Sequence, residues 1–75
     1  MRFTLREPGA VTLTVHDVAG RRVTTLVPGE VLPAGTHDLT WHGRDAMGRP
    51  VASGTYLLRL AGGDQQVMRR ALLLK

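Results

Sequence analysis

Short apolar stretches rich in Val, Thr and Leu alternate along this chain with clusters of Gly and Pro. The clusters are EPGA, VAGR, VPGE, LPAGT, HGRDAMGRP, ASGT and AGGD. Turn signals at intervals of about eight to twelve residues are typical of an antiparallel all-β sandwich or barrel. The only stretch whose residue types favour a helix is QQVMRRALLLK at the C-terminal end, and it is the one rival to an all-strand interpretation.

Most of these stretches alternate between apolar and polar residues, which places successive side chains on opposite faces of a sheet. The pattern predicts that VTLTVHD (11–17) buries its first, third and fifth residues, and that TYLLRL (55–60) buries its second, fourth and sixth. In HDLTW (37–41), the first, third and fifth residues share one face. RRVTTLV (21–27) is less regular because Val23 and Leu26 are three apart, and a β-bulge would return both to the core.

Counting MRFTLR as the first strand and RPVA as a short one gives about seven strands. We therefore predict one domain over residues 1–75. A chain of this length buries only about 60% of the surface that its unfolded form exposes. It also contains no cysteine, so disulfides cannot reinforce the core and thiolate chemistry is excluded.

The formal charge of +4 comes from ten basic and six acidic residues, a balance that invites a nucleic-acid interpretation. The arginines are spread along the sequence, however, and one Trp, one Tyr and one Phe offer little surface for base stacking. We expect a solvated Arg-rich surface and no nucleic-acid partner. No apolar run reaches the roughly 18 residues of a membrane span, and the N-terminal residues lack the apolar core of a signal peptide.

The spacing of the polar residues gives little support for catalytic or metal chemistry. His16–Asp17 and His37–Asp38 are adjacent pairs, so on a strand the two side chains of each pair point to opposite faces. The only serine, Ser53, lies in ASGTY, which is not a nucleophile elbow. AGGDQQ lacks the lysine of a phosphate-binding loop. We therefore expect no enzyme activity, no metal site and no cofactor.

The densest group of polar residues is WHGRDAMGRPVASGTY, from Trp41 to Tyr56. A catalytic loop and a structural turn are the two interpretations of it. Asp45 followed by Gly48 favours the turn, because an Asp carboxylate accepts backbone N–H bonds just ahead of it and Gly takes a positive φ. The two large aromatic side chains would then close the end of the core. The predicted turn and core-closing residues are Trp41, Gly43, Asp45, Gly48, Gly54 and Tyr56.

The C-terminal stretch ALLLK is apolar on both faces, so a strand there cannot simply turn one face to water. Either the strand is covered on both sides or it meets a partner. Together with the N-terminal strand, it gives a candidate interaction edge composed of Phe3, Leu5, Leu72, Leu73 and Leu74.

Three segments together resemble a known family. They are VTLTVHDVAGRRVTTLV, LPAGTHDLTWHGRDAMGRPVASGTYLLRL and MRRALLLK, which carry the patterns D-x-x-G-R-x-V, A-G-x-H, W-x-G-x-D-x-x-G and S-G-x-Y. This series resembles the FlgD-like Ig-like domain, and it looks equally like the related type IX secretion C-terminal sorting domains. The resemblance extends from about Val11 to Lys75. His42 stands where the family usually has Asp or Asn, which removes one turn-capping acceptor.

The resemblance implies an Ig-like or fibronectin-III-like antiparallel β-sandwich. It also implies a non-catalytic module of a secreted or cell-surface bacterial protein, acting in export, in anchoring or as a structural spacer, with an extracellular or cell-surface location. The expected partners are proteins, namely a domain of the parent chain, secretion machinery or copies of the chain itself.

Compared with the family, the chain begins at what resembles the second strand, so we expect the sandwich to lack the first one. A sandwich without one strand has an unpaired edge, to which a strand of another chain can add. The alternative function is therefore a self-assembling subunit of an extracellular fibre or sheath that associates by edge-strand complementation.

Overall fold

The computed structural model describes residues 1–63 and 65–75, and these residues form six strands. The strands are β1 (Arg2–Leu5), β2 (Gly9–Asp17), β3 (Arg22–Leu32), β4 (Gly35–Asp38), β5 (Gly54–Gly62) and β6 (Gln65–Leu73). No helix occurs in the described residues, which confirms the all-β prediction and makes the C-terminal stretch a strand rather than a helix. The same residues accordingly include no helix long and apolar enough to cross a membrane.

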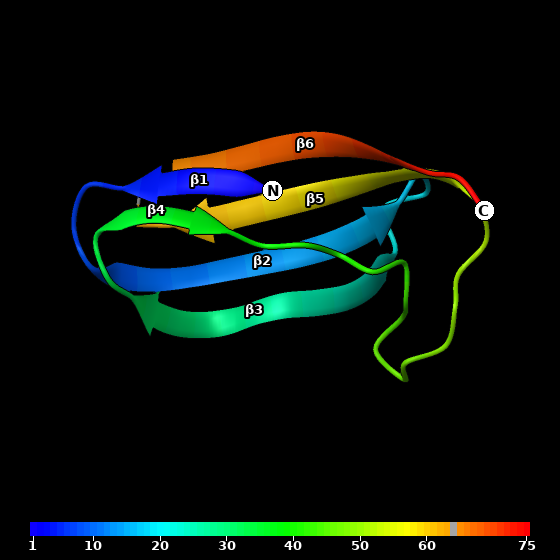
Figure 1. Cartoon of the computed structure of the whole chain (residues 1–75), viewed down its shortest axis with the longest axis horizontal. Coiled ribbons are helices and arrows are strands. Elements are labelled where there is room, and N and C mark those ends of the chain that lie inside the picture. The colour runs from blue at the N-terminus through cyan, green and yellow to red at the C-terminus, as the bar shows by residue number, and fades with distance from the viewer. Residues whose placement is uncertain (64) are drawn as a thin grey trace.

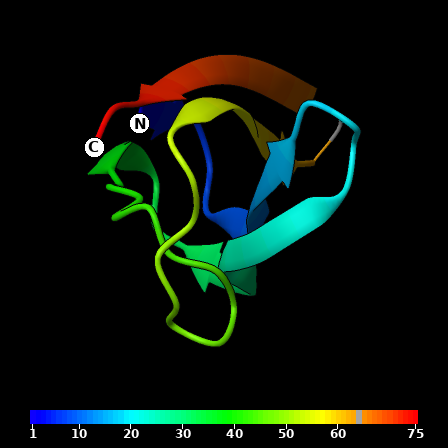
Figure 2. The same cartoon turned by 90° about the vertical axis from the view of Figure 1, so that its right-hand side faces the viewer.

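The strands form two antiparallel sheets of unequal size (Figure 1). The larger sheet has the order β3-β2-β5-β6, and the smaller one pairs β1 with β4. Figure 2 shows the two sheets enclosing the interior between them. This is the small sandwich that the sequence predicted, with a second sheet of only two strands.

The core is centred on β2, which runs through the interior of the larger sheet. Val11, Leu13 and Val15 are each at most 1% exposed, so the predicted alternation of this strand is confirmed. The register places Leu13 opposite Val27 on one side and opposite Leu60 on the other. The buried core consists of Phe3, Val11, Leu13, Val15, Val27, Tyr56, Leu58 and Leu60.

The irregular strand β3 contains the bulges that its sequence predicted. Three register shifts interrupt its pairing with β2. Two of them leave Val23 and Leu26 as extra residues on β3, and both side chains pack partly buried against the core. The third extra residue is Gly29, with a φ of 78°. A bulge lets apolar residues with irregular spacing share one face, so the prediction for this stretch is confirmed.

The prediction of a seventh strand at RPVA (49–52) is wrong. Only an isolated bridge between Arg44 and Pro50 occurs there. Proline has no N–H to donate to a neighbouring strand, and the Arg49 N–H donates to the Asp45 carboxylate at 3.0 Å. The stretch is therefore part of a loop that is held by its own side chains.

Candidate functional site

Two of the three histidines, His16 and His37, contact polar groups of residues close to them in the sequence. The His16 ring lies between the Thr14 hydroxyl, 2.9 Å from Nε2, and the Gly20 carbonyl, 3.4 Å from Nδ1. His37 Nε2 lies 2.7 Å from the Pro33 carbonyl. Within residues 1–63 and 65–75, no group of three His, Cys, Asp or Glu side chains is placed to hold a metal ion.

Two turns with the same sequence pattern, Asp-x-x-Gly-Arg-x-Val, lie at one end of the sandwich. The first runs from Asp17 to Val23 and connects β2 with β3, and the second runs from Asp45 to Val51 in the loop between β4 and β5. Both lie at the end where β2 terminates (Figure 1). The predicted site residues cover only the second turn, although the repeated spacing was sufficient to find the first.

In both turns the aspartate carboxylate holds the backbone. Oδ1 of Asp17 accepts the N–H groups two and four residues ahead at 3.0 and 2.9 Å, and Oδ1 of Asp45 accepts the equivalent pair at 2.9 and 3.0 Å. The arginine four residues ahead places its Nε 3.0 Å from Asp17 Oδ2 and 3.3 Å from Asp45 Oδ2. The glycine three residues ahead has a φ of 86° at Gly20 and 80° at Gly48. The two turns are thus closed by the same set of contacts.

The second turn is fixed to the body of the sandwich. The Ala46 N–H donates to the Val23 carbonyl at 3.2 Å, so the two turns contact each other. The Val51 N–H donates to the Gly43 carbonyl at 3.0 Å and closes the base of the loop. Gly43 has a φ of 72°, and a Cβ there would lie 3.1 Å from the Leu73 side chain. Glycine at this position therefore lets the loop approach β6.

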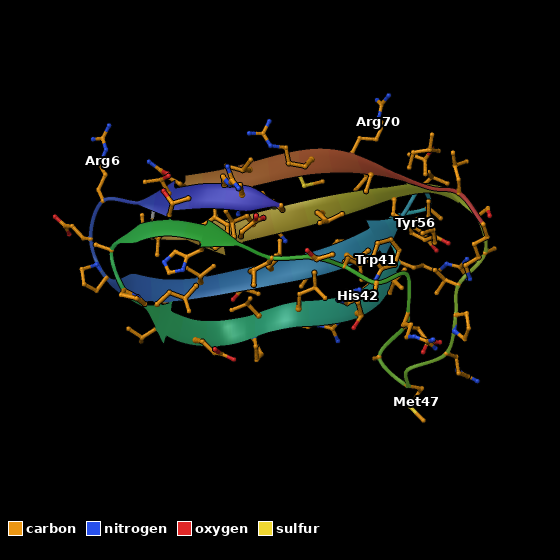
Figure 3. The ribbon with its side chains drawn as sticks, in the orientation of Figure 1. Arg6, Trp41, His42, Met47, Tyr56 and Arg70 are labelled. Atoms are coloured by element: carbon orange, nitrogen blue, oxygen red, sulfur yellow. The ribbon has the colours of Figure 1, made fainter. Side chains whose placement is uncertain are left out.

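Trp41 and Tyr56 lie together beside these turns (Figure 3). Their ring centroids are 4.8 Å apart at an interplanar angle of 65°, the edge-to-face arrangement that aromatic pairs favour. The indole N–H donates to the Arg44 carbonyl at 2.9 Å, and the Tyr56 hydroxyl donates to the Ala52 carbonyl at 2.7 Å. Tyr56 is buried and Trp41 half-buried. Gly54, the remaining predicted residue, begins β5.

The pKa values of the Asp17 and Asp45 carboxyl groups are lowered from their ordinary value. For each, the largest cause is the hydrogen bond from the backbone N–H four residues ahead, and the positive charge of the arginine there acts in the same direction. These contacts favour the ionised carboxylate over the protonated acid.

We expect the domain to lose stability as the pH falls through the acidic range. A carboxyl group whose pKa is lower in the folded than in the unfolded chain stabilises the fold above its unfolded pKa, here taken as the ordinary value of 3.8. That contribution is lost as the pH falls through the folded pKa. Thermal melts between about pH 7 and about pH 2 should show the decline, and Asp17→Asn combined with Asp45→Asn should flatten it. An equally steep decline in the double variant would contradict this assignment.

Gly48→Ala should destabilise the fold by about 1 kcal/mol or more. A Cβ at position 48 meets no atom within 4 Å, so the cost is the strain of a positive φ alone. Gly9→Ala is the matched control, because a Cβ there also meets nothing within 4 Å and its φ lies outside the left-handed range. Urea unfolding should find this control neutral or slightly stabilised. Equal stability of the two variants would mean that position 48 does not need glycine.

The residues of the candidate interaction edge lie in different environments. Phe3 is buried in the core, with its ring centroid 5.4 Å from that of His37, so its side chain offers little surface to a partner, although it contributes to the lining of one hollow. Leu5 and Leu73 are partly buried against the core. Leu72 and Leu74 are 67% and 78% exposed. Only these last two of the five present a large apolar surface to solvent.

β1 and β6 each leave one edge unpaired among the strands that the structure describes, because β1 pairs only with β4 and β6 only with β5. Three hollows lie in this region. Two are lined by residues of both β1 and β6, and the third by Met1, Trp41 and residues of β6. We call this strip, residues 1–5 together with 65–73, the seam. It is the place where the small sheet leaves the larger one incompletely covered.

Comparisons with known proteins agree with this geometry. The family model of the FlgD Ig-like domain matches residues 1–66, a range that starts before the resemblance seen in the sequence. The basal-body rod modification proteins FlgD of Salmonella typhimurium strain LT2 and of Salmonella typhi are each 42% identical over 67 residues. This alignment covers 84% of the chain and 28% of each relative, so the chain spans little more than a quarter of their length. No solved structure gives a significant match.

These relatives correct the expected location. The resemblance to type IX secretion sorting domains implied an extracellular or cell-surface protein. The curated relatives are instead named for modification of the basal-body rod. The extracellular and cell-surface prediction is therefore wrong.

Proposed function

This chain belongs to the FlgD Ig-like domain family, and on that basis we propose that residues 1–75 form a single non-catalytic module that works through protein contacts in assembly of the flagellar rod or hook. The observation that carries this proposal is the 42% identity to two proteins named for basal-body rod modification. This chain covers only 28% of each of those proteins. That it shares their role in the basal body is therefore also our proposal.

The structure supports a contact role in two ways. The Asp45 side chain of the Trp41–Tyr56 loop closes a turn by accepting two backbone N–H groups and pairing with Arg49. The unpaired edges of β1 and β6 supply backbone groups that a partner strand can bind. Both features are typical of a module that binds partners through the free edges of its strands and not of one that holds a substrate in a catalytic pocket.

A domain exchange tests the proposal. The segment of Salmonella typhimurium FlgD that aligns with this chain would be replaced by residues 1–75, and the chimera expressed in a strain that lacks FlgD. We expect the chimera to restore more swimming motility, and more hooks in electron micrographs, than FlgD from which the segment is deleted.

The matched control is the chimera with Leu13→Asp, which places a charge in the core and should abolish the gain without changing the contact surface. A chimera that accumulates to the level of native FlgD and yet performs no better than the deletion would contradict the proposal.

A self-assembling subunit remains the alternative proposal. It draws on the same unpaired edges and on the exposed Leu72 and Leu74. Against it, pairing of two β6 edges would bring Arg69 and Arg70 of each copy together, and like charges repel. Light scattering during size-exclusion chromatography distinguishes the two, because a self-assembling subunit gives a mass that rises with concentration.

A further inference from the structure

We propose that the seam binds an extended strand of a partner protein in which an acidic residue lies between two apolar ones, in the pattern apolar-x-acidic-x-apolar. This inference rests on the proposed function, because a module that acts through protein contacts requires a surface for its partner. It goes further by giving the place of the contact and the chemistry of the partner.

The backbone of the seam favours an extended occupant. β1 is a four-residue strand with one edge paired to β4 and the other facing β6. Figure 1 shows β1 lying along β6, and residues of the two strands line a common hollow. A strand that pairs with the free edge of β1 would extend the small sheet over the uncovered part of the larger one.

The side chains of β6 set the order of residues in the occupant. Alternation along β6 turns Val67, Arg69 and Ala71 toward the interior, since their partners across β5 include the buried Leu58 and Leu60. Val67 and Ala71 pack against the core, whereas Arg69 is exposed. Successive inward-facing residues of an added strand also lie two apart. An apolar, an acidic and an apolar residue would therefore meet these three positions in turn.

The charge of the seam points to an acidic partner. Arg2, Arg69 and Arg70 line one hollow together, and the lining residues that the structure describes include no Asp or Glu in any of the three hollows. Arg2 pairs with Asp38 at 3.2 Å, whereas neither Arg69 nor Arg70 forms an ion pair with any other described residue. Arginines of two strands thus line one hollow, and Arg69 has no ion-pair partner among the described residues, so a carboxylate of the partner would supply one.

Arg69 has a simpler interpretation, as an inward-pointing charge that prevents edge strands from aggregating. A guard of this kind requires one charge on the edge strand. Here Arg2 of β1 also lines the hollow, so an acidic side chain of an added strand would lie near arginines of two strands. Exposed ion pairs contribute little affinity, so backbone pairing and apolar burial would provide most of the binding and the arginines its selectivity.

The test is a titration of the purified chain with the peptide acetyl-TVTETVT-amide. Binding is monitored by the chemical shifts of backbone amides in NMR spectra and by the fluorescence of Trp41, which lines one of the hollows. The control peptide has lysine in place of glutamate. We expect shifts confined to β1 and β6 and an affinity about tenfold higher for the glutamate peptide. Equal affinity for the two peptides, or no shifts up to millimolar peptide, would overturn the proposal.

Charge reversal at one position then locates the contact. Arg69→Glu should reverse the preference between the two peptides, and Arg69→Gln should remove it. The matched control is Arg59→Glu, which makes the same change of net charge at an exposed position on the outer face of β5, and it should leave the preference unchanged. If Arg59→Glu acts as Arg69→Glu does, net charge alone is responsible and the seam is not the site.

Oligomeric state separates the remaining interpretations. If Arg69→Gln converts a monomer into larger species without loss of peptide preference, Arg69 is a guard against aggregation and the proposal fails. If the unmodified chain is a dimer that the peptide cannot displace, the occupant is a second copy and the proposal also fails. The domain exchange in FlgD reports on the module as a whole, so failure of peptide binding alone leaves the proposed function standing.

Discussion

Leu13→Ala should lower the free energy of unfolding by about 2–5 kcal/mol. Leu13 is fully buried at the centre of the larger sheet, between Val27 on β3 and Leu60 on β5. Removing its terminal carbons leaves a cavity that strands paired on both sides cannot easily close. In a domain this small, a loss of this size lowers the melting temperature by roughly 10 °C or more.

The matched control for this change is Leu72→Ala, because Leu72 is 67% exposed on β6 and the same atoms are removed from solvent-facing surface. Leu72→Ala should change the free energy of unfolding by no more than about 0.5 kcal/mol. If Leu13→Ala leaves no folded population, Leu13→Val should cost about 1 kcal/mol and can be measured instead. Equal losses for the changes at 13 and 72 would mean that the core is not centred on β2.

Trp41→Ala should cost about 2–4 kcal/mol, somewhat less than the loss of a fully buried aromatic residue, because Trp41 is half-buried. The change removes both the edge-to-face contact with Tyr56 and the hydrogen bond to the Arg44 carbonyl. It should therefore loosen the loop as well as the end of the core. Chemical denaturation gives the free energy of unfolding. It is monitored by circular dichroism, because the change removes the tryptophan whose fluorescence would otherwise report unfolding.

Trp41→Phe separates the two contributions. It keeps an aromatic ring against Tyr56 but loses the indole donor and part of the ring surface, so the expected cost is about 1–2 kcal/mol. A loss under about 1 kcal/mol for Trp41→Ala would show that the ring does not close the core, and equal losses for the two variants would mean that a phenyl ring at this position does not stabilise the fold.

The repeated turn shows how far local sequence can be followed into structure. Asp, Gly and Arg at fixed spacing are sufficient to place a carboxylate over two N–H groups and a glycine at positive φ, because all these contacts lie within five residues. The contact between the two turns, from the Ala46 N–H to the Val23 carbonyl, joins residues far apart in the chain. No local pattern predicts it.

The sequence by itself determined the all-β class, the inward faces of β2 and β5, and the bulges of β3. Each of these follows from the period of apolar residues and from turn chemistry, which act over a few neighbouring residues. It failed for RPVA, where the Arg49 N–H donates to the Asp45 carboxylate and is not free to pair with a strand. The burial of Phe3 depends on the pairing of β1 with β4, which no local pattern predicts.

Only the tertiary structure decided which edges stay free and what lies between them. Strand order in a sheet is a long-range property, since β1 and β4 are separated in the sequence by two strands of the other sheet. The same is true of charge, because Arg2 and Arg69 lie near opposite ends of the chain and yet line one hollow. The packing of the two sheets places both arginines in the seam, and no local pattern in the sequence predicts this.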